Sequence, residues 1–481
     1  MSELARVAGL VGCIGLALLL TARPRELRLL GLGLWASGLV GLGLYLAPDG
    51  HTGRLVVVAG AGFAVAALGA WLLLHRPWVL AFATLACVPA RIPVEVGGED
   101  ANLLVPLYAV VAALALSLAW SIWRNGAQPA RELGPTAVPL AAFVAWTGLT
   151  LVWTDDLREG AIFLGAFALP FGLLALGFAR LPWRGRMLTW LWSTLVATAV
   201  AYAAIGAYQW GTRDVFWNPK VIVGNAYAPF FRVNSIFWDP SIYGRYLVVA
   251  ILASLAGVLL GGVRGRRVVG LYAVIAVSWV GLLLSFSQSS FAALSVGAAA
   301  AAAVVWRWRA IGAIAMLAAA FVASALAVPQ VRAEIVDKSR SGLNNVTSGR
   351  ASLVGQGIRI ALDNPVAGVG VGSFKQAYAE RTGLEGRDPK KAASHSTPVT
   401  VAAEEGIAGL VLFAWLVAAA LLASLRGLGL GFTSRVSLAV GLTLLAIVVH
   451  SLFYNALFED PMTWVLVGLV GLCVRVPRRP T

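Results

Sequence analysis

The sequence predicts an all-α integral membrane protein, a polytopic bundle of about 12–15 transmembrane helices with one large polar loop. Hydrophobic residues make up 59% of the 481-residue chain and charged residues 12%, whereas soluble domains are about a quarter charged. The apolar residues recur in runs of roughly 17–25, the length that crosses a bilayer as a helix. We therefore expect a single integral domain over residues 1–481.

The apolar runs define about fifteen candidate spans when each run is taken as one helix. The shortest, Trp78–Pro89, is kept because the charge bias of the loops alternates only if this run crosses the membrane. In chain order the expected spans are Leu4–Ala22, Leu29–Ala47, Leu55–His75, Trp78–Pro89, Leu103–Trp123, Thr136–Thr154, Ala161–Ala179, Met187–Trp210, Ser241–Gly262, Val268–Ser287, Phe291–Trp306, Ile311–Val328, Val399–Leu425, Val436–Asn455 and Met462–Val474.

Basic residues concentrate in every second loop between the spans. Loops rich in arginine stay on the cytoplasmic side, so we expect these loops and the C-terminus inside, and an odd number of spans places the N-terminus outside. The net charge of +15 then follows from membrane topology, and no nucleic-acid partner is expected. The basic loops hold Arg23, Arg25, Arg28, Arg76, Arg124, Arg131, Arg180, Arg184, Arg186, Arg264, Arg266, Arg267, Arg307, Arg309, Arg426, Arg435, Arg475, Arg478 and Arg479, and the opposite loops hold Asp49, Glu95, Glu99, Asp100, Asp155, Asp156, Glu159, Glu459 and Asp460.

Two longer loops fall on the outer face in this arrangement, at residues 211–240 and 329–398. Loops longer than about 12–15 residues commonly carry function. The second loop lies in a polar stretch from about Val328 to Thr400, where a helical pattern after Arg350 ends before Pro365 and a glycine-rich bend follows. We expect this loop to supply the chemistry of the protein on the outer face of the membrane.

Cationic side chains on the outer side are candidates for binding an anion. Asp239 and Pro240 have the pattern of the N-cap and first turn of a span, with Arg232 before them and Arg245 about one turn inside. Arg232 suits bidentate binding of a phosphate. Arg245 either snorkels to the membrane surface or faces a cavity and marks an anion site. Arg350 is either a solvated loop residue or a second phosphate clamp.

His395 is the candidate base, because it lies in the large outer loop at the mouth of a span. A neutral imidazole can remove a proton from a hydroxyl near neutral pH, although a lone histidine is often structural. Glu404 and Glu405 follow within the outer part of that span, where an unpaired carboxylate is costly. They either orient His395, contact an arginine, or form a structural ion pair.

Other chemistry has little support in the sequence. Cys13, Cys87 and Cys473 lie far apart inside apolar runs, so we expect packing rather than a disulfide or metal site. The run Gly-Val-Gly-Val-Gly-Ser does not open a helix after a strand, and there is no Walker A sequence or metal-ligand spacing. We expect no metal and no cofactor. We also expect no cleavable signal at residues 1–21, which lack a basic start and an A-x-A site.

Taken together, the outer-face motifs resemble those of the O-antigen ligase and O-antigen polymerase superfamily of bacterial membrane proteins. The resemblance covers the chain from Arg232 to Gly409 and rests on the order and spacing of the motifs. They are Arg232-x-x-Ser-x-Phe-x-Asp-Pro, Ser-Gly-Arg350, Asn-Pro-x-x-Gly-x-Gly-x-Gly-Ser-Phe, and a histidine followed by Glu-x-Gly-Ile-x-Gly.

The resemblance implies a GT-C-like fold and an inverting, metal-independent glycosyl transfer at the outer face of the bacterial cytoplasmic membrane, among membrane lipids. The implied donor is a glycan on a polyprenyl diphosphate. The implied acceptor is lipid A core for a ligase or another lipid-linked repeat for a polymerase, and the motifs leave both open. By position, Arg350 would hold the donor diphosphate, His395 would activate the acceptor hydroxyl, and Arg232 would support the donor site.

The sequence departs from the superfamily pattern at two positions. Gln288, in Ser-Phe-Ser-Gln-Ser-Ser-Phe, stands where the superfamily has arginine, so we expect Arg245 or Arg91 to supply that charge in the substrate site. Ser396 follows His395 where the superfamily has asparagine. Two other interpretations compete. A transporter of lipid-linked oligosaccharide or polysaccharide predicts several intramembrane charges and two repeated halves, and a structural partner in a wall-synthesis complex predicts no effect of changing the histidine.

Overall fold

The fold is described from a computed structural model of residues 1–481. The structure describes all of them except 48–51, 97–98, 126–131, 184–185, 228–230, 261–264, 308, 311, 313, 316–349, 384–393, 427–431 and 475–481. Of the predicted outer loop at 329–398, it therefore describes residues 350–383 and 394–398.

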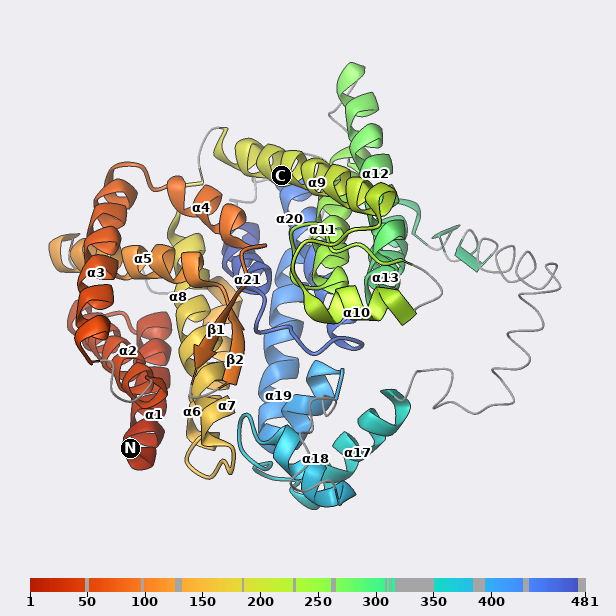
Figure 1. The fold of residues 1–481 in the computed structure, drawn as a ribbon. Helices are drawn as coiled ribbons and strands as arrows, with labels where there is room; N and C mark the ends of the chain where they lie inside the picture. The colour runs from red at the N-terminus through yellow and green to blue at the C-terminus, as the bar shows by residue number, and fades with distance from the viewer. Residues whose placement is uncertain are drawn as a thin grey trace.

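Helices dominate the described chain, which confirms the predicted all-α class (Figure 1). In chain order they are α1 Ser2–Thr21, α2 Arg25–Leu46, α3 Thr52–His75, α4 Val79–Cys87, α5 Val105–Asn125, η1 Gly134–Thr136, α6 Ala137–Thr150, α7 Leu157–Ile162, the π-helical turn η2 Phe163–Ala168, α8 Leu169–Arg180, α9 Met187–Thr212, α10 Pro219–Tyr227, α11 Pro240–Leu259, α12 Arg266–Ser285, α13 Gln288–Trp306, α17 Arg350–Asp363, α18 Phe374–Thr382, α19 Thr397–Leu425, α20 Phe432–Ser451 and α21 Pro461–Val474.

Ten helices in the described ranges are long and apolar enough to cross a membrane, which confirms a polytopic bundle. The predicted span Trp78–Pro89 is wrong as a membrane-crossing helix. Its helix α4 has nine residues, about 14 Å at 1.5 Å per residue, against a hydrocarbon core of about 30 Å. The prediction that the N-terminus lies outside depended on an odd number of spans that included this one, so it loses its support. The predicted span Ile311–Val328 falls mainly outside the described residues.

A two-stranded hairpin between α4 and α5 is an addition to the predicted all-helical chain. Strands β1 (Ile92–Val96) and β2 (Glu99–Leu103) pair antiparallel, with Val94 opposite Ala101. Apolar residues alternate with other residues along β1, and this period of two favours a strand over a helix. The hairpin occupies the connection that the charge pattern assigned to the outer face.

The most buried span runs continuously from α7 through the π-helical turn into α8. Every residue from Leu169 to Ala179 in α8 is buried. Pro170, in the first turn of α8, has no N–H to donate to the preceding turn, and a local π-helical bulge accommodates such an interruption. This span packs against α21 and α5 and forms the centre of the bundle.

Helix α19 contains a sharp kink that receives the glycine-rich bend. Gly406 has φ 67°, a conformation that only glycine adopts without strain. The kink exposes backbone groups of α19, and the bend binds them: Val369 N–H donates to Ala403 O at 3.0 Å, and Gly370 N–H donates to Glu404 O at 2.8 Å. The two sequence motifs around Gly370 and Gly406 are therefore the two halves of one backbone contact.

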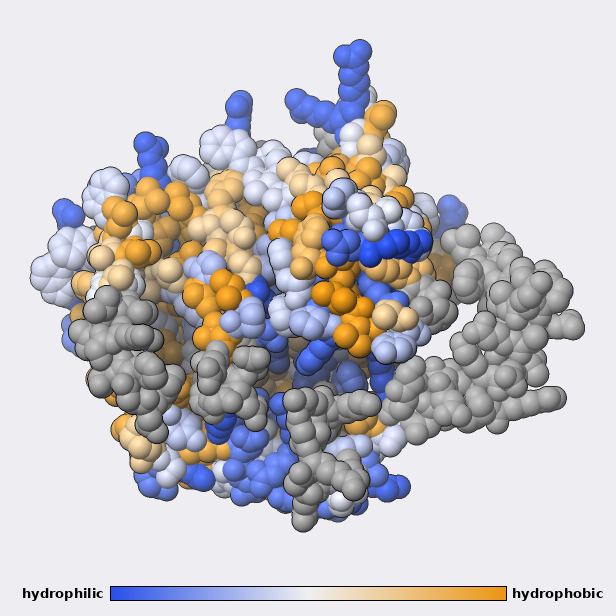
Figure 2. Space-filling view, viewed as in Figure 1, coloured by the Kyte–Doolittle hydropathy of each residue, from blue (hydrophilic) through white to orange (hydrophobic). Residues whose placement is uncertain are grey.

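The large-loop helices α17 and α18 lie at the same end of the bundle as the start of α1 (Figure 1). Thr154, after α6, links these parts, because its carbonyl accepts from Arg6 Nη2 at 3.1 Å and its hydroxyl donates to Val371 O at 2.7 Å. Hydrophilic residues gather at this end, and hydrophobic residues cover much of the helices above it (Figure 2). This distribution fits a polar layer outside the bilayer, capped by the described part of the large loop.

Candidate functional site

His395 is held in a left-handed backbone conformation just before α19, with φ 54°. The buried hydroxyl of Ser394 fixes this turn. It donates to Ser396 O at 2.9 Å, accepts from Ser396 N–H at 3.1 Å, and lies 2.5 Å from the hydroxyl of Thr400. The imidazole is half-buried. A positive φ on a non-glycine residue is uncommon and costs free energy, so the turn determines where this ring points.

The charge of Arg350 acts on His395. Burial lowers the pKa of His395, and the positive charge of Arg350 lowers that pKa further. Arg350 itself is exposed and is the first residue of α17. The structure therefore brings the predicted base and the predicted cation of the large loop into one electrostatic environment, although they are 45 positions apart in the sequence (395 − 350).

Arg232 joins the same environment from the other outer loop. Burial lowers the pKa of Arg232, Asp239 opposes this shift, and the charge of Arg350 adds to it. The Arg232 Nε donates to Ser285 O at 3.1 Å. Its backbone N–H and C=O are both bound by the side chain of Asn225, each at 2.9 Å. The charge of Arg350 therefore acts on the pKa of Arg232 as well as on that of His395.

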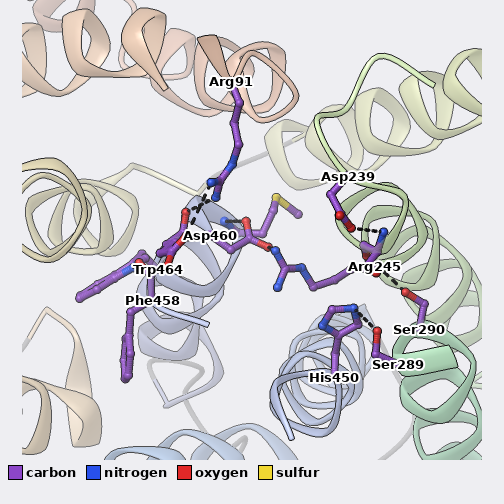
Figure 3. Close-up of polar contacts among 12 residues, drawn as sticks. Arg91, Asp239, Arg245, Ser289, Ser290, His450, Phe458, Asp460 and Trp464 are labelled. Atoms are coloured by element: carbon purple, nitrogen blue, oxygen red, sulfur yellow. Dashed lines mark hydrogen bonds and ion pairs between the residues drawn. The ribbon is translucent and has the colours of Figure 1, made fainter. Parts of the chain in front are cut away.

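Arg245 and Arg91, expected to replace a missing arginine, are both in ion pairs (Figure 3). Arg245 Nη2 lies 2.6 Å from Asp460 Oδ2, and both side chains are buried. Arg91 Nη1 lies 3.6 Å from the Glu459 carboxylate, and its Nη2 donates to Glu459 O at 3.0 Å. A carboxylate already balances each cation. These two arginines tie α11 and the β1 hairpin to the start of α21, and a direct role in substrate binding stays a prediction.

Asp239 is the N-cap of α11, as expected, and its Oδ1 accepts from Ser241 N–H at 2.6 Å. Gln288, the first residue of α13, is exposed. Beside it Ser289 contacts the buried His450 of α20, with Oγ 3.0 Å from Nε2 (Figure 3). Sequence reasoning did not single out His450, because only the fold brings it to the N-terminus of α13.

Glu404 and Glu405 have structural partners. A Glu404 carboxylate oxygen accepts from Phe374 N–H at 3.1 Å, and a Glu405 carboxylate oxygen accepts from the Thr147 hydroxyl at 3.1 Å. In the described ranges, no hydrogen bond or ion pair joins either carboxylate to His395 or to an arginine. These contacts fasten the glycine-rich bend and α6 to α19, and a role of either carboxylate in orienting His395 stays a prediction.

Ser373 completes that fastening and was missed in the sequence. Its hydroxyl accepts from the N–H groups of Asp155 and Asp156, each at 3.0 Å, and lies 2.6 Å from the Thr154 hydroxyl. Burial raises the pKa of Asp156, whose side chain accepts from Glu159 N–H at the start of α7. The Gly-Ser-Phe sequence at the end of the glycine-rich bend can be recognised in the sequence. Its partners at residues 154–156 cannot, because they lie 217–219 positions away in the chain.

The described residues contain no group of three or more His, Cys, Asp or Glu side chains that could hold a metal ion. Among the described cysteines, Cys13, Cys87 and Cys473 are free.

Residues 271–414 match the model of the O-antigen ligase family. The match spans α12, α13, α17, α18 and the first part of α19, and it includes Gln288, Arg350, His395 and the Glu404–Glu405 pair. It excludes Arg232 and the other outer-loop candidates before residue 271. No curated protein matches the chain.

Proposed function

We propose that this chain is a membrane glycosyltransferase of the O-antigen ligase and polymerase type, and that it transfers a glycan from a polyprenyl diphosphate to an acceptor hydroxyl; the match of residues 271–414 to the O-antigen ligase family supports the proposal. The acceptor is a lipid or glycan on the outer face of the cytoplasmic membrane. The observation that carries the proposal is the family match over residues 271–414, which contain both Arg350 and His395.

The guanidinium groups of Arg350 and Arg232 suit the leaving group. In the transfer, the bond between the anomeric carbon and the diphosphate oxygen breaks, and its electron pair leaves with the diphosphate. Negative charge therefore grows where two cations lie in a partly buried, polar region, and fixed charges placed at such a point stabilise the transition state. Arg350 at the exposed start of α17 is accessible to a substrate, and Arg232 is held in place by Ser285 and Asn225.

His395 suits the acceptor. Its lowered pKa keeps the imidazole neutral near pH 7, which is the form that accepts a proton. The acceptor oxygen attacks the anomeric carbon as His395 takes its proton, in a single displacement that inverts the configuration. General-base assistance of this kind contributes about 10²–10⁴-fold to a rate. The proposal routes no step through a metal ion.

The test uses the full-length protein in vesicles with a defined lipid-linked repeat, alone and with candidate acceptors. We expect His395→Ala to lower transfer by about 10²–10⁴-fold and Arg350→Ala to lower it strongly, with unchanged insertion. Arg359→Ala is the matched control, because Arg359 lies exposed in the same helix α17 and is expected to leave transfer unchanged.

The products separate the remaining alternatives. A ladder from the repeat alone identifies a polymerase, and a single adduct with an added acceptor identifies a ligase. The anomeric configuration of the product tests inversion, and full activity in excess EDTA tests metal independence. Transfer by the His395→Ala protein at the wild-type rate, or movement of the lipid-linked glycan across vesicles without bond formation, would overturn the proposal.

A further inference from the structure

Helix α10 presents an apolar face that the described part of the chain leaves exposed. Val221 and Asn225 are half-buried and face the bundle. Ile222, Val223 and Tyr227 are 47%, 57% and 87% exposed. With about 100° between successive residues, these three lie on one side of the helix and the half-buried pair on the other. The helix is therefore amphipathic, with the polar side chain of Asn225 facing the bundle and an apolar stripe of Ile222, Val223 and Tyr227 facing outward.

The residues before α10 extend this face and add positive charge. Phe216 and Trp217 are 41% and 47% exposed. Arg213 stacks its guanidinium 4.0 Å from the centroid of the Trp210 ring, and Lys220 is exposed in the first turn of the helix. Within the described part of the chain, neither cation forms an ion pair with a carboxylate. Aromatic rings beside unpaired cations are typical of segments at a lipid–water interface.

The position of α10 indicates what covers this face. It lies between α9 and α11, two candidate membrane spans, and its nine residues are too few to cross a bilayer. In Figure 1 it lies crosswise to α11 and α13, and in Figure 2 hydrophobic residues gather over its position. The spans beside it are surrounded by lipid. A surface of phospholipid, with acyl chains for the stripe and phosphate groups for Arg213 and Lys220, fits this composition.

Asn225 connects this face to the candidate site. Its Oδ1 accepts from the Arg232 N–H and its Nδ2 donates to the Arg232 C=O, each at 2.9 Å. These two hydrogen bonds hold the backbone of Arg232 to α10. A diphosphate on a polyprenyl carrier lies at the depth of the lipid phosphates, so a helix resting on that surface is suited to set the depth of Arg232.

We infer that α10 is an interfacial helix that binds the phospholipid surface and that Asn225 is a positioning residue that transmits its depth to Arg232. The second half of this inference rests on the proposed function, whereas the lipid contact does not.

The lipid contact is tested by the depth of spin labels in the full-length protein, after replacement of Cys13, Cys87 and Cys473. Val223→Cys places a label on the stripe, and Arg359→Cys places one on the exposed face of α17, at the polar end of the protein. In vesicles of phosphatidylethanolamine and phosphatidylglycerol, we expect the label at 223 to be relaxed mainly by oxygen and the label at 359 mainly by a water-soluble nickel complex. Equal access of the nickel complex to both positions would overturn the lipid contact.

The coupling is tested by the kinetics of Asn225→Ala with two donors, one with a long polyprenyl chain and one with a short, water-soluble chain. We expect the KM for the long-chain donor to rise about tenfold, a free-energy change within the range for two lost hydrogen bonds, and the KM for the short-chain donor to change little. Asn225→Asp, which keeps the acceptor oxygen, is expected to recover part of the loss.

An equal change for both donors would show a general structural role and overturn the coupling. If both Asn225 variants fail to fold, the double variant Ile222→Ser and Val223→Ser tests the coupling instead, because it leaves Asn225 intact. We expect this double variant to raise the KM of the long-chain donor alone. Absence of any transfer by the wild-type protein would instead contradict the proposed function, and the spin-label depths would still decide the lipid contact.

Discussion

Arg245 and Asp460 form a buried ion pair across the bundle, with Nη2 2.6 Å from Oδ2. Asp460 also accepts from Met462 N–H at 2.9 Å and so starts α21. A single carboxylate thus balances a buried charge of α11 and begins the last described helix.

Asp460→Asn is predicted to destabilise the protein by about 3–5 kcal/mol, because removing one partner of a buried pair leaves the other charge uncompensated. The asparagine amide still offers an acceptor oxygen to Met462 N–H, so the loss of stability measures the effect of removing the charge. Thermal unfolding in detergent, followed by tryptophan fluorescence, measures the effect. Glu459→Gln is the control. Its pair with Arg91 is partly exposed, with 36% of the glutamate side chain accessible, and such pairs contribute about 0–1 kcal/mol. Similar melting temperatures for the two variants would contradict the prediction.

Arg350→Gln is predicted to move the acidic limb of the pH–rate profile to higher pH. In the proposed reaction His395 must be neutral, so activity is expected to be lost as the pH falls through the lowered pKa of this residue. Burial is the larger cause of the lowering and the charge of Arg350 the second. Removing that charge therefore raises the pKa, and protonation begins at higher pH. The profile of kcat/KM against pH measures the midpoint, with Arg359→Gln as the control, and an unchanged midpoint would disprove the electrostatic link.

Ser394→Ala is predicted to lower kcat by about 10–100-fold with little change in KM, because misplacing a catalytic group by about 1 Å has effects of this size. The serine hydroxyl holds the turn that keeps His395 at φ 54°. Ser394→Thr retains the hydroxyl and is expected to recover most of the rate. Single-turnover transfer separates kcat from binding, and an equal loss in both variants would mean that the hydroxyl does not orient the imidazole.

Gly406→Ala is predicted to destabilise the contact between α19 and the glycine-rich bend. A side chain at φ 67° costs about 1–3 kcal/mol, and the new Cβ also collides with the carbonyl of Val366. Limited proteolysis of the 365–383 segment and the melting temperature measure the loss. Gly355→Ala in α17 is the control, because its Cβ meets open space in a helix and the substitution is expected to stabilise slightly. A neutral Gly406→Ala would show that the kink can relax.

The membrane class and the motifs of the large loop could be predicted from the sequence, because both depend on local patterns. Apolar runs define spans wherever they occur, and the order of Arg232, Ser-Gly-Arg350, the glycine-rich bend and His395 is visible without any coordinates. The choice of His395 and Arg350 as partners was predicted in the same way, and the structure adds that the charge of one acts on the other.

The partners of the remaining charges could not be predicted. Arg91 and Glu459 are 368 positions apart, and nothing local in either segment indicates that they meet. Arg245 or Arg91 was expected to supply a charge to the substrate site, and Glu404 or Glu405 to orient the histidine, contact an arginine or form an ion pair. In the structure both arginines are in ion pairs, and each carboxylate accepts a hydrogen bond from a residue of another segment.

The sequence by itself determined that this chain crosses a membrane, and its motifs predicted the residues of a glycosyl transfer, because hydrophobic length and motif order are properties of the chain alone. The tertiary structure decided which of the charged residues are engaged in ion pairs. In a low-dielectric bundle a charge is held by whichever opposite charge the fold brings within a few ångströms, and that choice is made by the packing of distant helices.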